Sequence, residues 1–184
     1  DPITGVATQC ASINRRAFQW IKERPPAVVV LSARWSYYNS HGVDVIKELD
    51  RVLSSLRRSR SQTVLIGPIP EWVPALPQRA FQETFRHGGQ IPARLHDQGE
   101  ESIRELDVKM RRLARRHRIE YVSLREELCN AEGCRISLTS RSNQTALVSW
   151  DSAHLTRPAS EWLMETAIAP KIVRLLRENA RAGD

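Results

Sequence analysis

Ala27-Val28-Val29-Val30-Leu31 is a continuous apolar run, rich in β-branched residues, that follows two prolines. Such a run is typical of a strand that is buried on both faces of a parallel sheet. Thr63-Val64-Leu65-Ile66 repeats the pattern and stops at Gly67-Pro68, and Ile119-Glu120-Tyr121-Val122 is a third candidate strand. Long segments separate the three runs, so they predict parallel rather than hairpin pairing.

The segments around these strands have the spacing of amphipathic helices. We expect helices over residues 11–24, 43–56 and 101–116, and a final helix that begins at Thr156 or Arg157. The alternation of helices and strands fits right-handed βαβ units and therefore an α/β fold with helices on both faces of the sheet. We expect the proline-rich segment from Ile69 to Ala93 to be a long loop that shapes a site.

The 184 residues are enough for one domain with a real core. Doubly wound sheets of the flavodoxin type usually have five strands and open on a strand, whereas this chain shows three and opens on a helix. We therefore expect residues 1–184 to form a single domain from which an N-terminal β-α-β portion is missing.

The composition indicates a globular protein, with 41% hydrophobic and 27% charged residues. No apolar run reaches the roughly 20 residues that a membrane-spanning helix needs. The net charge is +7 and, because only four of the 28 basic residues are lysines, 24 are arginines. We expect these arginines to be solvated on helix surfaces rather than to bind nucleic acid, which such a charge would also permit.

Cys129 and Cys134 enclose a four-residue loop. A disulfide, which would place the protein outside the cytosol, is favoured over two free thiols and over a zinc pair. A second ligand pair at zinc-finger spacing is lacking, so no metal site is expected. Cys10 is left over, and we expect its partner to lie outside this sequence.

Asp151 and His154 are three residues apart, immediately before the last predicted helix. In a helical turn this spacing brings the two side chains together. A carboxylate that accepts a hydrogen bond from one imidazole nitrogen leaves the other nitrogen free to act as a base. The alternative, a simple capping aspartate, is less favoured because ligands in α/β folds bind at this edge of the sheet.

Together these features resemble the SGNH (GDSL-like) hydrolase superfamily, and in particular the SGNH domain fused behind membrane acyltransferase family 3 proteins. The resemblance rests on three stretches and on the two-cysteine loop: Val28 to Trp35, Gly67-Pro68-Ile69-Pro70, and Asp151-Ser152-Ala153-His154-Leu155-Thr156. It implies a flavodoxin-like three-layer α/β/α fold and makes Asp151 and His154 two members of a Ser-His-Asp triad.

The resemblance also implies a partner and a location. The partner is a membrane acyltransferase domain of the same polypeptide, the acceptor a cell-surface polysaccharide such as lipopolysaccharide O-antigen, and the location the periplasmic side of the inner membrane. It suggests an O-acetyltransferase that needs no cofactor. A free secreted carbohydrate esterase and a non-enzymatic, arginine-rich binding module are the alternatives.

The sequence departs from the family pattern at two places. It contains no Gly-Asp-Ser nucleophile motif, in agreement with the missing N-terminal portion, so we expect this chain by itself to be inactive. Where the superfamily has Gly-x-Asn-Asp, this chain has Ser32-Ala33-Arg34-Trp35. Arg34 and Trp35 are therefore candidates for oxyanion or substrate binding, although Arg34 fits equally a structural ion pair.

Other side chains near the strand ends are weaker candidates. Ser32 follows a buried strand but lacks the Gly-x-Ser-x-Gly elbow that would expose it as a nucleophile. Several aromatic residues could form a stacking wall for a sugar, although core packing is the commoner role of such residues: Trp35, Tyr37, Tyr38 and Trp72.

Overall fold

A three-stranded parallel sheet is the centre of the computed structural model, which describes residues 4–86, 88–96, 100–139 and 145–183. The strand order is β1 (Val28–Leu31), β2 (Gln62–Ile66) and β4 (Glu120–Val122), with β2 in the middle. Val30 lies opposite Val64, and Ile66 lies opposite Val122. The three predicted strands and their parallel pairing are confirmed.

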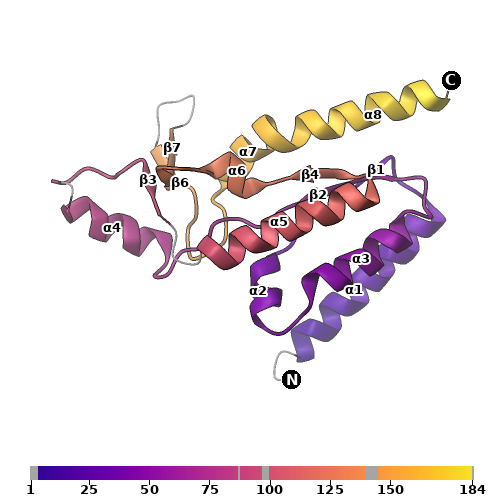
Figure 1. Ribbon diagram of the computed structural model, residues 1–184, viewed down its shortest axis with the longest axis horizontal. Coiled ribbons are helices and arrows are strands. Elements are labelled where there is room, and N and C mark those ends of the chain that lie inside the picture. Colours follow the sequence, from indigo (N-terminus) through magenta and orange to yellow (C-terminus); the bar gives the residue numbers. More distant parts are fainter. Residues whose placement is uncertain (1–3, 87, 97–99, 140–144, 184) are drawn as a thin grey trace.

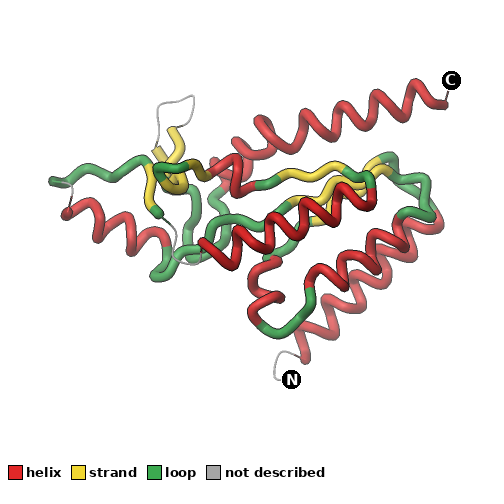
Figure 2. Tube along the Cα trace, in the orientation of Figure 1, coloured by secondary structure: helices red, strands yellow, loops and turns green. Residues whose placement is uncertain are grey.

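Helices cover both faces of this sheet (Figures 1 and 2). Alternate side chains of β2 enter two separate cores: Leu65 packs with α3 and α5, whereas Val64 and Ile66 pack with the C-terminal helices. The three-layer α/β/α arrangement is therefore confirmed. The helices of the layers are α1 (Thr4–Glu23), α3 (Val45–Leu56), α5 (Glu100–His117), α7 (Arg157–Leu163), the π-helical turn η1 (Met164–Ile168) and α8 (Ala169–Gly183).

The final helix begins where the sequence predicts. The Thr156 side chain accepts a hydrogen bond from the Ala159 N–H and caps α7. The helix is interrupted by η1 before it continues as α8. Pro170 gives a physical reason, because it has no N–H to donate to the carbonyl four residues earlier. Within the described ranges, no helix is both long and apolar enough to cross a bilayer.

The expectation that the first strand is buried on both faces is wrong. Val29 is buried, but Val30 is 44% exposed. The reason is topological, since β1 lies at the edge of the sheet and, among the described residues, pairs with β2 alone. A cavity of about 450 Å³ adjoins this edge, between α1 and α3. Apolar residues such as Ile21, Leu31 and Val52 line it.

The segment from Ile69 to Ala93 is not one long loop, because it contains the helix α4 (Leu76–Arg86). The prolines of this segment led us to expect no helix here. Pro77, however, lies in the first turn of α4, where proline is tolerated. Leu76 and Ala80 are buried, whereas Phe81 and Phe85 are exposed. This mixture blurs the amphipathic pattern.

Several short elements were not predicted. They are α2 (Trp35–Ser40), α6 (Leu124–Leu128), β3 (Arg94–Leu95), β5 (Cys129–Asn130), β6 (Gly133–Arg135), β7 (Ser137–Thr139) and β8 (Thr145–Leu147). Cys129 and Cys134 lie directly opposite each other on β5 and β6, and a disulfide joins them. Cys10 lies in α1, and its side chain is outside the described part of the chain.

A buried carboxylate joins the carboxyl end of the sheet to α5. Asp107 accepts hydrogen bonds from the Tyr121 hydroxyl at 2.7 Å and from the Ser123 hydroxyl at 2.8 Å. Burial, together with the hydrogen bond to Asp107, raises the pKa of Tyr121, so the phenol remains a donor. Gly67 packs directly on this pair, and its N–H donates to the Val122 carbonyl at 2.7 Å.

Replacing Gly67 should therefore destabilise the fold. A Cβ at this position would overlap the Tyr121 hydroxyl and would lie 2.8 Å from an Asp107 oxygen. We expect Gly67→Ala to lower the free energy of unfolding by about 1–3 kcal/mol, the usual cost of overpacking, measured by urea denaturation. The same substitution in a Tyr121→Phe background should cost less, because the overlapping hydroxyl is gone. Equal costs in both backgrounds would contradict this explanation.

Candidate active site

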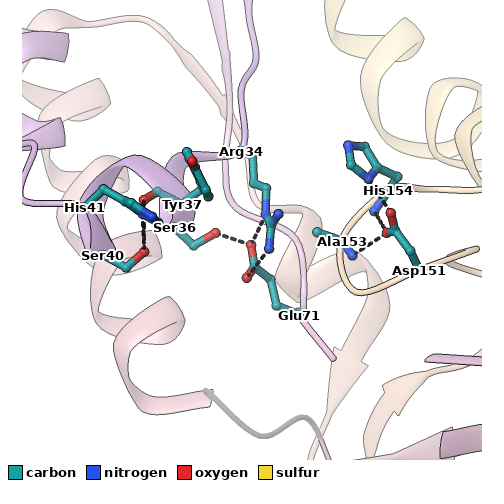
Figure 3. A network of polar contacts seen from close by, with 9 residues as sticks. All are labelled: Arg34, Ser36, Tyr37, Ser40, His41, Glu71, Asp151, Ala153 and His154. Carbon is teal, nitrogen blue, oxygen red and sulfur yellow. Dashed lines mark hydrogen bonds and ion pairs between the residues drawn. The ribbon is translucent and has the colours of Figure 1, made fainter. Parts of the chain in front are cut away.

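Three segments meet beyond the carboxyl end of the sheet, where α/β proteins bind ligands. They are the residues that follow β1, the loop that follows β2, and the loop that precedes α7 (Figure 3). Backbone hydrogen bonds join the last two: the Trp72 N–H donates to the Ser152 carbonyl at 2.9 Å, and the Leu76 N–H donates to the Asp151 carbonyl at 3.2 Å. The two loops are thereby held together.

The structure brings Asp151 and His154 into direct contact. His154 Nδ1 lies 2.6 Å from Asp151 Oδ2. The other oxygen, Oδ1, accepts the N–H groups of Ala153 at 2.8 Å and of His154 at 2.7 Å. An ionised carboxylate can only accept, so the neutral imidazole donates from Nδ1 and keeps a lone pair on Nε2. This is the arrangement of a general base with its orienting carboxylate.

The environment keeps Asp151 ionised. Burial by itself would raise the pKa of this carboxyl, but the hydrogen bonds from the two backbone N–H groups and from the His154 ring lower it to about 2. The carboxylate therefore holds the ring at neutral pH without taking its proton. The side chain of His154 is 60% exposed, so the imidazole ring is open to solvent.

The loop that carries this pair is fixed by backbone pairing. Ser149 and Leu155 form an antiparallel bridge, and inside it the Trp150 N–H donates to the His154 carbonyl at 3.1 Å. The Trp150 indole stacks on the His154 ring, with the ring centroids 5.3 Å apart and the planes 25° apart. Nothing in the sequence marks Trp150 as a contact of His154, because the stacking depends on the bridge between Ser149 and Leu155.

Arg34 makes the ion pair that was one of its two expected roles. Its Nε donates to Glu71 Oε1 at 2.9 Å and its terminal nitrogen to Oε2 at 3.1 Å. The Ser36 hydroxyl also donates to this carboxylate (Figure 3). Burial opposes ionisation of Glu71, but the bonds from Arg34 and Ser36 outweigh it and lower the pKa.

The hydrogen bond to Glu71 raises the pKa of Arg34, and the negative charge of Asp151 also raises it. The Arg34 guanidinium is therefore close enough to Asp151 to interact with its negative charge, while two of its N–H groups are hydrogen-bonded to Glu71. Glu71 is a residue of the site that the sequence analysis missed. Its signal was its position after β2, in the stretch Gly67-Pro68-Ile69-Pro70-Glu71.

Trp72 is 1% exposed and belongs to the core, the commoner role for such aromatic residues, so it does not contribute to a stacking wall. The Trp35 indole N–H donates to the Ile66 carbonyl at 2.7 Å, so it anchors α2 to the end of β2. A contact of Trp35 with substrate remains a prediction. Among the described residues, Ser32, Ser36 and Ser152 make no hydrogen bond to His154, and the Ser36 hydroxyl is engaged with Glu71.

The α/β/α fold and the Asp-His pair before its last helix define a domain of the SGNH type. More specifically, the chain belongs to the family described as "SGNH domain (fused to AT3 domains)", which matches residues 2–168. The resemblance inferred from the sequence is confirmed. No curated protein sequence matches the chain significantly.

A solved structure with the same fold is the periplasmic domain of the lipopolysaccharide acetyltransferase from Salmonella ser. Paratyphi A. The two are 24% identical, with a TM-score of 0.71 over 88% of this chain. The chain spans 62% of the length of that domain. At this identity the likeness establishes the fold.

The Arg34–Glu71 ion pair should contribute measurably to stability. Arg34→Met, Glu71→Gln and the double variant form a cycle, and we expect a coupling of about 1 kcal/mol in urea denaturation, because the pair is bidentate and Glu71 is largely shielded from water. The exposed Arg51–Glu48 pair on α3 is the matched control, with an expected coupling of about 0.5 kcal/mol or less. Additive effects of the two substitutions would show that the ion pair does not stabilise the fold.

Proposed function

We propose that this chain is part of the extracytoplasmic SGNH domain of an O-acetyltransferase that acetylates a cell-surface polysaccharide such as lipopolysaccharide O-antigen. The observation that carries the proposal is the Asp151–His154 pair, with its 2.6 Å hydrogen bond and its accessible imidazole. The fusion to AT3 domains in the family description supports a membrane acyltransferase domain in the same polypeptide. The periplasmic structural neighbour supports the periplasmic side of the inner membrane as the location.

The nucleophile in this proposal is a serine of a Gly-Asp-Ser segment on a further strand of the same polypeptide. We place that strand against the unpaired side of β1, which would complete the single domain expected from the sequence. The exposure of Val30 and the apolar cavity beside it support this position. A parallel strand there would end at the same edge as β1, and so near His154.

The reaction then consists of two acyl transfers. In the first, His154 Nε2 takes the serine proton while Oγ bonds to the acyl carbon delivered by the membrane domain. The bond between that carbon and its donor group breaks, and the proton passes to the departing donor group. In the second, Nε2 takes the proton of a sugar hydroxyl while its oxygen bonds to the acyl carbon. The carbon–Oγ bond breaks, and the proton returns to Oγ. Asp151 stays ionised throughout and stabilises the imidazolium.

Arg34 fits the role of a charged donor to the oxyanion or to an acidic group of the acceptor. Its ion pair with Glu71 uses two of its five N–H groups and holds the guanidinium plane in place. Trp35 supports this role indirectly in the proposal, because its bond to Ile66 fixes the first turn of α2, next to Arg34.

Substitutions of Asp151 and His154 test this function in the full-length membrane protein. We expect His154→Ala to abolish acetyl transfer to the polysaccharide and hydrolysis of a small acetyl ester, because the base is gone. Asp151→Asn should lose about 10⁴-fold, the loss seen when the orienting carboxylate of a serine protease is removed. His41→Ala is the control, since this exposed histidine stacks on Tyr37 away from the pair. Near-wild-type transfer by folded His154→Ala protein would refute the assignment. Ester hydrolysis without any transfer to sugar would favour the secreted esterase instead.

The 184-residue chain by itself should not form an acyl-enzyme, because no serine among the described residues is hydrogen-bonded to the His154 ring. We expect no labelling by a serine-directed fluorophosphonate probe and no hydrolysis of acetyl esters above the rate of free imidazole. Intact-mass spectrometry after incubation with the probe measures this directly. Stoichiometric labelling of Ser32, Ser36 or Ser152 with matching loss of activity would place the nucleophile inside the chain.

A further inference from the structure

Trp150 presents a large aromatic surface beside the proposed base. The residue is 61% exposed, whereas Trp72, also close to this edge of the sheet, is 1% exposed. Exposing an indole forgoes the free energy that its burial would provide. The backbone on either side is nevertheless fixed, by the Ser149–Leu155 bridge and by the bond from the Trp150 N–H to the His154 carbonyl. An ordered, exposed indole next to a reactive group suggests a ligand contact.

The stacking geometry determines what this contact can hold. The imidazole stacks against one face of the indole at a centroid distance of 5.3 Å and an angle of 25°. The opposite face of the indole makes no contact with the imidazole. A ring that packs there at van der Waals contact, roughly 3.5–4 Å from the indole, is separated from the imidazole by the whole thickness of the indole. A sugar ring on the opposite face is therefore a different ring from the one whose hydroxyl reaches Nε2.

We propose that Trp150 forms a subsite for the sugar unit next to the one that is acetylated, in an extended polysaccharide acceptor. The inference rests on the proposed function. The C–H groups on the flat face of a pyranose carry partial positive charge, which suits the negative face of an aromatic ring. Successive units of a polysaccharide are covalently linked, so one unit on the indole positions its neighbour at His154. The site thereby selects a polymer over a single sugar.

The test compares two acceptors in the full-length membrane protein. One is the surface polysaccharide of the source cell after chemical de-O-acetylation, and the other is the methyl glycoside of the unit that it acetylates. We expect Trp150→Ala to lower the ratio of kcat/KM for the polymer to kcat/KM for the glycoside about tenfold, mainly through KM for the polymer, because one stacked ring contributes about that much binding. Trp150→Phe retains a ring and should keep the ratio within about threefold.

The controls separate this subsite from the other possibilities. Phe85→Ala removes a 73% exposed aromatic residue from α4 and should leave the ratio unchanged. Equal losses for both acceptors in Trp150→Ala would show that the indole acts only by positioning the His154 ring and would overturn the subsite. An unchanged ratio, in protein whose transfer is abolished by His154→Ala, would also overturn it while leaving the proposed function intact. Trp150→Leu keeps an apolar side chain without a ring and serves in place of Trp150→Ala if the latter does not fold. A wild-type ratio of the two kcat/KM values in Trp150→Leu would also refute the subsite.

Discussion

Two backbone hydrogen bonds, from Trp72 to Ser152 and from Leu76 to Asp151, hold together the loops on which the site depends. They join segments that are far apart in the sequence, and both are made by groups at the start of α4 or just before it. Trp72 is buried beneath this junction, so burial of a large ring supports the alignment of the loops. Glu71 precedes Trp72 in the chain, and its position sets that of Arg34. The Asp151–His154 pair and the arginine therefore share one structural support rather than two.

The sequence predicts the central sheet and the last helix because their signals are local. Val64, Leu65 and Ile66 are buried on both faces of β2, as a continuous apolar run predicts for a central parallel strand. Thr156 caps α7 with its own side chain, and Asp151 and His154 are close enough in the chain to pair within one turn. For the helix cap and the Asp-His pair the partner lies within a few residues, and for β2 the apolar run itself indicates burial, so the pattern in the sequence is sufficient.

Features that depend on distant partners could not be predicted in this way. Val30 has the sequence of a buried strand residue, but its exposure is decided by whether another strand pairs with β1. Glu71 looks like an ordinary loop carboxylate until β1 and α2 bring Arg34 and Ser36 to it. Trp72 and Trp150 are the same residue type near the same edge of the sheet, yet one is core and the other exposed. Only tertiary packing distinguishes them.

The site is preorganised in one respect and open in another. The carboxylates of Asp151 and Glu71 both have their own donors, which lower their pKa values and keep two negative charges fixed close to Arg34. The bond between Asp151 and His154 forms within a single loop and orients the imidazole. The imidazole and the Trp150 indole nevertheless face solvent. In the proposed reaction, an imidazole that is oriented before any reactant arrives would serve first a serine and then a sugar hydroxyl, since neither is needed to hold it in place. Discrimination between a sugar and water would then have to come from surfaces beside the imidazole, and Trp150 is in direct contact with it.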